Sequence, residues 1–170
     1  MSPLKRTWAP RGETPTIWTS VEHNERLNLI GALCLTPSAR KLKLHVRSYW
    51  DTVTGNQVVE FLEHLLAHVP GPIVLLWDKH PIHKRKVVKA FLAQHPRLMV
   101  EWFPTAAPEL NPTEGVWAQI SEYTASTAPH GKAELQSKVM AGLARTRRSQ
   151  RRLWACIFGS ELPWRGKRGH

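Results

Sequence analysis

Two carboxylates stand in the sequence where a β-sheet would bring them together. Asp78 directly follows "IVLLW" (Ile73–Trp77), a continuously apolar run that predicts a strand covered on both faces. Glu114 lies in "ELNPTEGVW", after a second predicted strand from Leu98 to Phe103. Ligands of such sheets collect beyond the carboxyl ends of parallel strands. We therefore expect Asp78 and Glu114 to share one crevice at the sheet edge.

A shared crevice predicts a particular chemistry. Two converging carboxylates repel each other unless a cation lies between them. Mg²⁺ prefers oxygen ligands and keeps several waters, so the pair indicates metal-assisted cleavage or transfer of a phosphodiester. The spacing of Asp78, His80 and His83 also fits zinc, but no second cluster of ligands accompanies it in the sequence.

Glu114 also has an explanation that involves no function. Asn111 is a good N-cap, Pro112 suits the first helical position, and Glu114 then falls third, from where it can bond the backbone N–H of the cap. Asp78 has no such role, because Pro81 delays the next helix. We expect Asp78 to face the crevice.

The surrounding pattern predicts the elements that position these residues. "RLNLIGALCL" and the alternating "KLKLHVRSYW" predict two antiparallel strands. Thr54 and Gln57 have the spacing of a capping box that opens a helix ending near Pro70. Three further helices are expected, over 84–94, 112–123 and 132–148. The fold class is therefore α/β, with a mixed sheet flanked by helices.

Bulk properties predict a single folded domain. The chain has 170 residues, 42% of them apolar, with eight tryptophans. It has no charged-then-apolar leader and no apolar run long enough for a membrane span, so we expect a soluble, cytoplasmic protein. Cys34 and Cys156 lie in apolar surroundings and are interpreted as reduced core residues.

The positive charge is concentrated near the C-terminus. Net charge is +11, and residues 131–170 carry ten Lys/Arg against two Asp/Glu. This favours a polyanionic partner such as DNA, with nucleoid association when bound. The predicted DNA-binding residues are Arg145, Arg147, Arg148, Arg151 and Arg152. Two alternatives remain open: a solubilising tail, or a segment that docks on the body through Leu153, Trp154, Ile157 and Phe158.

Several motifs together resemble one family. "VLLWDKHPIHKRKVVKAFL" followed by "VEWFPTAAPELNPTEGVW" is similar to the second half of the DDE catalytic domain of mariner-type insertion-sequence transposases. "RTWAPRGETP" (Arg6–Pro15) resembles the segment after the first catalytic Asp of that family. The resemblance implies a ribonuclease H-like catalytic domain over residues 1–125, followed by a C-terminal helix and basic tail over 126–170.

The resemblance also implies roles for single residues. Asp78 would be the second acidic ligand and Glu114 the third, both catalytic and both binding Mg²⁺ or Mn²⁺. His83 matches a recurrent family His and, with Asn111 and Pro112, would form the site architecture. The implied reaction is two-metal DNA cleavage and strand transfer during transposition.

The chain departs from the family pattern in ways that predict an incomplete site. The first catalytic Asp is absent before Arg6, and its strand would be the central one, between 26–35 and 73–77. Lys79 replaces an Asn, and Gly115 replaces an Arg. We therefore expect a truncated domain that is inactive alone, with an upstream-encoded N-terminal half or a second copy as a partner. The alternative is a non-enzymatic nucleic-acid-binding protein that reuses the fold.

Overall fold

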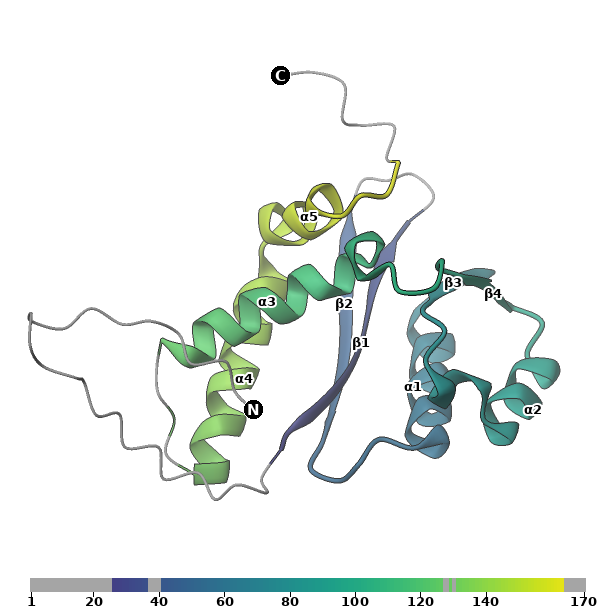
Figure 1. The fold of residues 1–170 in the computed structure, drawn as a ribbon, viewed down its shortest axis with the longest axis horizontal. Coiled ribbons are helices and arrows are strands. Elements are labelled where there is room, and N and C mark those ends of the chain that lie inside the picture. The colour runs from purple at the N-terminus through teal and green to yellow at the C-terminus, as the bar shows by residue number, and fades with distance from the viewer. Residues whose placement is uncertain (1–25, 37–40, 127–128, 130, 164–170) are drawn as a thin grey trace, which may run out of the picture.

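The computed structural model describes residues 26–36, 41–126, 129 and 131–163. Figure 1 shows two small sheets with helices on either side. The strands are β1 (Asn28–Leu35), β2 (Leu42–Tyr49), β3 (Ile73–Trp77) and β4 (Leu98–Trp102). The α-helices are α1 (Gly55–His68), α2 (Lys86–Gln94), α3 (Pro112–Ala125), α4 (Gly131–Arg148) and α5 (Gln150–Gly159), and two short 3₁₀ helices are η1 (Pro81–Lys84) and η2 (Pro108–Leu110).

Strands β1 and β2 form an antiparallel pair covered on both faces. The register joins Leu35 to Leu42 and Asn28 to Tyr49. Leu42 and Leu44 point to the core formed with α3, α4 and α5, and alternate residues of β1, including Ile30, pack against the core of α1. The alternation of the sequence thus places two apolar layers on the two faces of one sheet.

Strands β3 and β4 form a parallel pair of which the described residues cover one face. Ile73 and Leu75 are buried in the same core as α1 and α2. On the other face Val74, Leu76 and Met99 are 57%, 49% and 46% exposed. The prediction that Ile73–Trp77 is buried on both faces is therefore wrong for the described residues, because no described element covers Val74 and Leu76.

Helix α1 joins the two sheets. Its buried residues Val58, Phe61, Leu62 and Leu65 form one core with residues of β3 and β4, against which Ile30, Ala32 and Cys34 of β1 also pack. Both sheets therefore share α1 as a common helical layer. Among the described residues, however, β1 pairs only with β2 and β3 only with β4.

The free edge of β2 is closed by side chains. The backbone N–H and C=O of Leu42 bond the amide of Gln150 at 2.9 and 2.8 Å, and the Nε of Arg147 donates to the C=O of Leu44 at 3.0 Å. In an antiparallel ladder one residue directs both backbone groups to the same side. The backbone N–H and C=O groups of Leu42 and Leu44 thus point away from β1. Their register with β1 means that the backbone groups of Leu29, Gly31 and Leu33 likewise point away from β2.

The predicted order of elements is confirmed, with local differences. The predicted helix over 84–94 is preceded by η1 and starts at Lys86, and α3 extends to Ala125. A single mixed sheet is not formed by the described residues, because β1 and β3 do not pair. Cys34 and Cys156 are free thiols, as predicted. The segment Arg6–Pro15 and Trp164 lie outside the described residues.

Helix α5 was not predicted as a helix. It packs on α3 and α4 through Leu153, Cys156 and Ile157, all buried, with Leu153 fully so. This confirms the docking alternative for Leu153, Ile157 and the half-buried Trp154, whereas Phe158 remains 43% exposed. No helix in the described ranges combines the length and apolarity that crossing a bilayer requires.

Replacing the N-cap of α1 should cost stability. Thr54 accepts a hydrogen bond from the Asn56 N–H, and Gln57 accepts one from the Thr54 N–H at 2.9 Å, so the predicted capping box is present. Thr54→Ala should lower the free energy of unfolding by about 1 kcal/mol in urea titrations. Thr52→Ala, in the exposed segment before the helix, is the control and should be nearly neutral.

Candidate active site

Asp78 is held in place at the carboxyl end of β3. Its Oδ1 accepts a hydrogen bond from the His80 N–H at 3.0 Å and lies 3.2 Å from the Nε2 of His83. Helix α2 is capped at Arg85, so Asp78 caps no helix, as predicted. Its side chain is 57% exposed, which leaves the second carboxylate oxygen open to solvent.

His83 positions Asp78. Its ring stacks on Trp77 with 4.3 Å between centroids, and only 18% of the side chain is exposed. Burial lowers the pKa of His83, while the neighbouring Asp78 raises it and His80 lowers it further. A neutral ring that donates from Nε2 to Asp78 leaves Nδ1 as the acceptor, and Nδ1 is buried with no partner in the described part of the chain.

Glu114 is not used in a capping box. Asn111 caps α3 by accepting from the Thr113 N–H at 3.1 Å, and Pro112 takes the first position, as predicted. The backbone N–H of Asn111, which Glu114 would bond in a capping box, instead donates to the C=O of Pro108 at 2.9 Å. The carboxylate of Glu114 is therefore exposed in the first turn rather than bonded to the backbone.

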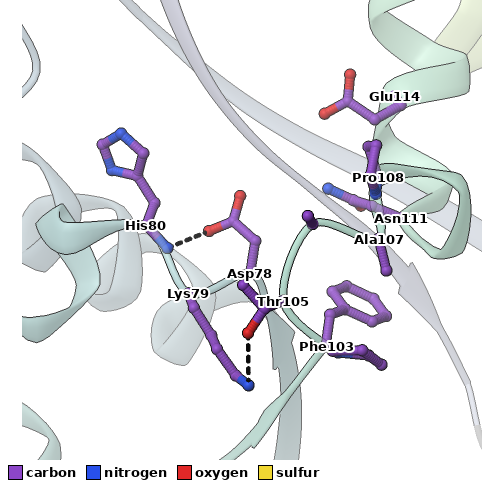
Figure 2. A pocket seen from close by; sticks show the side chains of 11 residues that line it. Asp78, Lys79, His80, Phe103, Thr105, Ala107, Pro108, Asn111 and Glu114 are labelled. Carbon is purple, nitrogen blue, oxygen red and sulfur yellow. Dashed lines mark hydrogen bonds between the residues drawn. The ribbon is translucent and has the colours of Figure 1, made fainter.

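The two predicted carboxylates line one pocket. Its volume is about 310 Å³. Figure 2 shows Asp78 and Glu114 on two sides of it, with Ala107 and Pro108 of the segment between β4 and α3 lying between them. The lining residues are Asp78, Lys79, His80, Phe103, Pro104, Thr105, Ala106, Ala107, Pro108, Asn111 and Glu114.

One loop–loop contact in this pocket was missed by sequence reasoning. The Nζ of Lys79 donates to the Oγ1 of Thr105 at 3.1 Å, which ties the end of β3 to the loop after β4. Ala106 in that loop adopts φ 55°, a left-handed conformation that costs a non-glycine residue about 1 kcal/mol or more. The available signal in the sequence was the mismatch of Lys79 with the family pattern.

Gly115 has a packing role that the sequence did not reveal. A Cβ at this position would lie 3.1 Å from the Cβ of Cys156 and 3.2 Å from its Cα. The start of α3, which carries Glu114, therefore lies directly against α5. A side chain at this position, such as the Arg of the family pattern, would therefore press on Cys156.

The donor set partly fits a hard divalent cation. Two carboxylates that line an open, water-accessible pocket are suitable ligands for Mg²⁺ or Mn²⁺, which complete their coordination with waters. In the described ranges, no group of three or more His, Cys, Asp or Glu residues is arranged to hold a metal. The zinc alternative thus finds no support, and a hard-cation site would have two protein carboxylates.

The five predicted DNA-binding arginines lie around the junction of α4 and α5, but they are not equivalent. Arg147 closes the edge of β2, and the guanidinium of Arg145 lies 5.6 Å from the centre of the Tyr123 ring. Arg152 is half-buried and the other four are exposed, but Arg148 and Arg151 make no such contact with the described residues. Arg148 and Arg151 are therefore the most accessible to a phosphate backbone.

Comparison with known proteins adds one finding to this geometry. A family model described as DDE superfamily endonuclease matches residues 1–135, which include β1 to β4, α3 and both pocket carboxylates. A search of the curated proteins finds no match. Proteins of this family use divalent metal ions and act on DNA, in agreement with two carboxylates on one pocket and a strongly basic chain. The chain belongs to the DDE superfamily endonuclease family.

Proposed function

We propose that this chain is part of a mariner-type transposase catalytic domain that acts on DNA phosphodiesters at the pocket between Asp78 and Glu114. The observation that carries the proposal is that both carboxylates line one pocket beyond the end of β3. Helix capping explains neither residue: Asp78 caps no α-helix and engages the His80 N–H and His83 through Oδ1, and the backbone N–H that Glu114 would cap is bonded to Pro108.

Asp78 and Glu114 are the residues that would hold the divalent ion. A bound Mg²⁺ or Mn²⁺ would polarise the scissile phosphate and stabilise the attacking and leaving oxygens. His83 fixes the carboxylate of Asp78 by a hydrogen bond and by stacking on Trp77. Asn111 and Pro112 begin α3 so that Glu114 faces the pocket, and Lys79 brings a cation to the pocket that suits a phosphate oxygen.

We further propose that the fold lacks one central strand and that the chain alone is inactive. Support comes from the strand edges: the backbone groups of Leu29, Gly31 and Leu33 in β1 and of Val74 and Leu76 in β3 have no partner among the described residues. Proteins normally pair or protect such edges, as Gln150 and Arg147 do for β2. A strand between β1 and β3, supplied by an N-terminal half encoded upstream, would pair both edges and provide the first Asp.

Manganese binding tests the metal site directly. Titration of the chain with Mn²⁺, followed by electron paramagnetic resonance of the free ion, should show one site. Asp78→Asn and Glu114→Gln should each weaken binding by about tenfold or more, since each removes a direct ligand. Glu122→Gln, near the other end of α3, is the control. Equal affinities for all four proteins would contradict the metal site.

DNA binding should depend steeply on salt. Each neutralised phosphate adds roughly −0.9 to the slope of log affinity against log salt concentration. Replacing exposed Arg148 and Arg151 by Gln should reduce the slope by about 2 in fluorescence anisotropy with duplex DNA. The control with the same charge change is Lys86→Gln with Lys89→Gln on exposed positions of α2. A flat response to salt would exclude the arginines as a phosphate-binding surface.

A second candidate function is nucleic-acid binding without catalysis. It is favoured by the exposed Arg148 and Arg151 together with the lack of a three-ligand metal group in the described ranges. This alternative predicts that Asp78→Asn and Glu114→Gln leave DNA affinity unchanged both with and without Mn²⁺. The transposase proposal predicts that Mn²⁺ strengthens DNA binding only when both carboxylates are present.

A further inference from the structure

Three histidines meet between β2 and α1, away from the pocket. The Nδ1 of His45 lies 3.2 Å from the Nε2 of His64, and the rings of His64 and His68 have centroids 4.1 Å apart. The Nδ1 of His68 donates to the backbone C=O of His64 at 2.8 Å. We call His45, His64 and His68 the imidazole cluster.

Protonated His45 would have no hydrogen-bond partner for its second ring N–H among the described residues. Its Nδ1 already bonds His64, and its Nε2 is buried without a partner in the described part of the chain. An imidazolium carries N–H donors on both nitrogens. Protonated His45 would therefore bury an unpaired, charged N–H, which is costly.

The charged groups facing the cluster also oppose protonation. They are Lys43 and Arg47 on β2 and Arg147 on α4, all cationic. Glu60, one turn before His64 on α1, accepts a hydrogen bond from Tyr49 at 3.3 Å. Cys34, which packs on the core of α1 from β1, stays a neutral thiol because burial raises its pKa to about 11. None of the charges acting on His45 or His64 is negative.

The cluster lies at the contact that joins the two sheets. Helix α1 shares its core with β3 and β4, and it meets the β1–β2 sheet through Ile30, Ala32 and Cys34. The described hydrogen bonds between α1 and that sheet are His45–His64 and Tyr49–Glu60. Anything that weakens them loosens β3 and β4 from β1 and β2.

We propose that the imidazole cluster is a proton-sensitive latch that holds α1 on the β1–β2 sheet while all three rings are neutral. When the cluster takes up a proton, the new positive charge lies beside Arg147 and Lys43, and the His45–His64 contact becomes repulsive if both rings are charged. The α1 helix then separates from β2 more readily, and the two sheets lose their shared layer.

The direction of the pH effect follows from the pKa shifts. Burial, followed by the neighbouring histidines and cations, lowers the pKa of His45 from 6.5, and burial followed by His68, Arg47 and Arg147 lowers that of His64. The unfolded chain therefore binds more protons than the folded one just below pH 6.5. The contribution of the latch is full above that pH and is lost as pH falls from 6.5 toward the lowered folded values.

Urea unfolding of the full chain at pH 7.5 and pH 5.5 tests the latch. Between these two pH values wild type should show a several-fold loss in its folding equilibrium constant through the cluster, because the unfolded chain takes up protons on His45 and His64 that the folded chain does not bind. His45→Gln combined with His64→Gln should lose markedly less. His95→Gln is the matched control, because His95 also stacks on its own helix and bonds a C=O four residues back, at Phe91. It should keep the loss seen in wild type.

Two further measurements keep the test decisive. If the double variant does not fold, His68→Gln, at an exposed position, should still reduce the loss by removing one of the neighbouring charges. Native-state hydrogen exchange, corrected for intrinsic rates, should show protection lost in α1 and β1 at pH 5.5 while the α3–α5 core stays protected. Equal pH dependence of wild type and the cluster variants, or uniform loss of protection, would overturn the proposal.

Discussion

Purified alone, the chain should produce no Mg²⁺- or Mn²⁺-dependent nicks in supercoiled plasmid DNA. Two-metal catalysis holds its ions about 3.5–4 Å apart by bridging ligands, and two carboxylates are too few to place both. In the described residues only Asp78 and Glu114 bring carboxylates to the pocket. The conversion of supercoiled to open-circular plasmid should therefore equal that of Asp78→Ala and of buffer.

The same assay tells whether the chain is inactive because a central strand is missing or because its own residues cannot support catalysis. Adding the polypeptide encoded directly upstream should produce nicking if it contributes a strand and an Asp, and Asp78→Ala in the mixture should abolish it. Strong nicking by the chain alone that is lost in Asp78→Ala would refute the proposal of inactivity. Nicking that persists in Asp78→Ala indicates a contaminating nuclease.

Gly115→Arg should destabilise the fold although it restores the residue of the family pattern. Arg has a helix propensity more favourable than that of Gly by up to about 1 kcal/mol. Against this, overpacking a close contact costs about 1–3 kcal/mol, and the Cα of Cys156 would lie 3.2 Å from the new Cβ. Because one of these close atoms is backbone, the backbone of α5 at Cys156 has to shift by a few tenths of an ångström, so we expect a net loss of about 1–2 kcal/mol in urea unfolding.

Ala118→Arg gives the matched control for Gly115→Arg. It adds the same side chain to α3, one turn later and at an exposed position, so it should be nearly neutral. If Gly115→Arg stabilised the fold by the full helix-propensity gain of about 1 kcal/mol, α5 would not pack closely at the start of α3. In that case the position of Glu114 would not depend on the C-terminal helices.

Local signals were sufficient to predict the element boundaries that border the candidate site. The apolar run before Asp78 and the Asn-Pro pair before Glu114 each determine an element boundary within a few residues, and the structure has both. The capping box at Thr54 is equally local. Such features depend on backbone preferences that act over three or four residues, so they are visible in the sequence.

The missed features depend on residues far apart in the chain. The helical spacing of the apolar residues in α5 was hidden by Arg151 and Arg152 near the start of this helix. The contact of Gly115 with Cys156 exists only once α5 has docked on α3. The alternating pattern of β2 places His45 on the face expected to be exposed to solvent. In the structure α1 lies over this face, and His64 of α1 contacts the ring of His45. No local pattern reports such pairings.

The closure of β2 by Gln150 and Arg147 has a consequence for self-association. Extended chains add to bare sheet edges, and a molecule with two bare outer edges can continue that growth into filaments. Here one side is already occupied by two long polar side chains from the α4–α5 junction. A strand from another molecule can therefore add to this sheet only at the edge of β1. One added strand fills that edge, so the association stops at a single partner instead of growing into a filament.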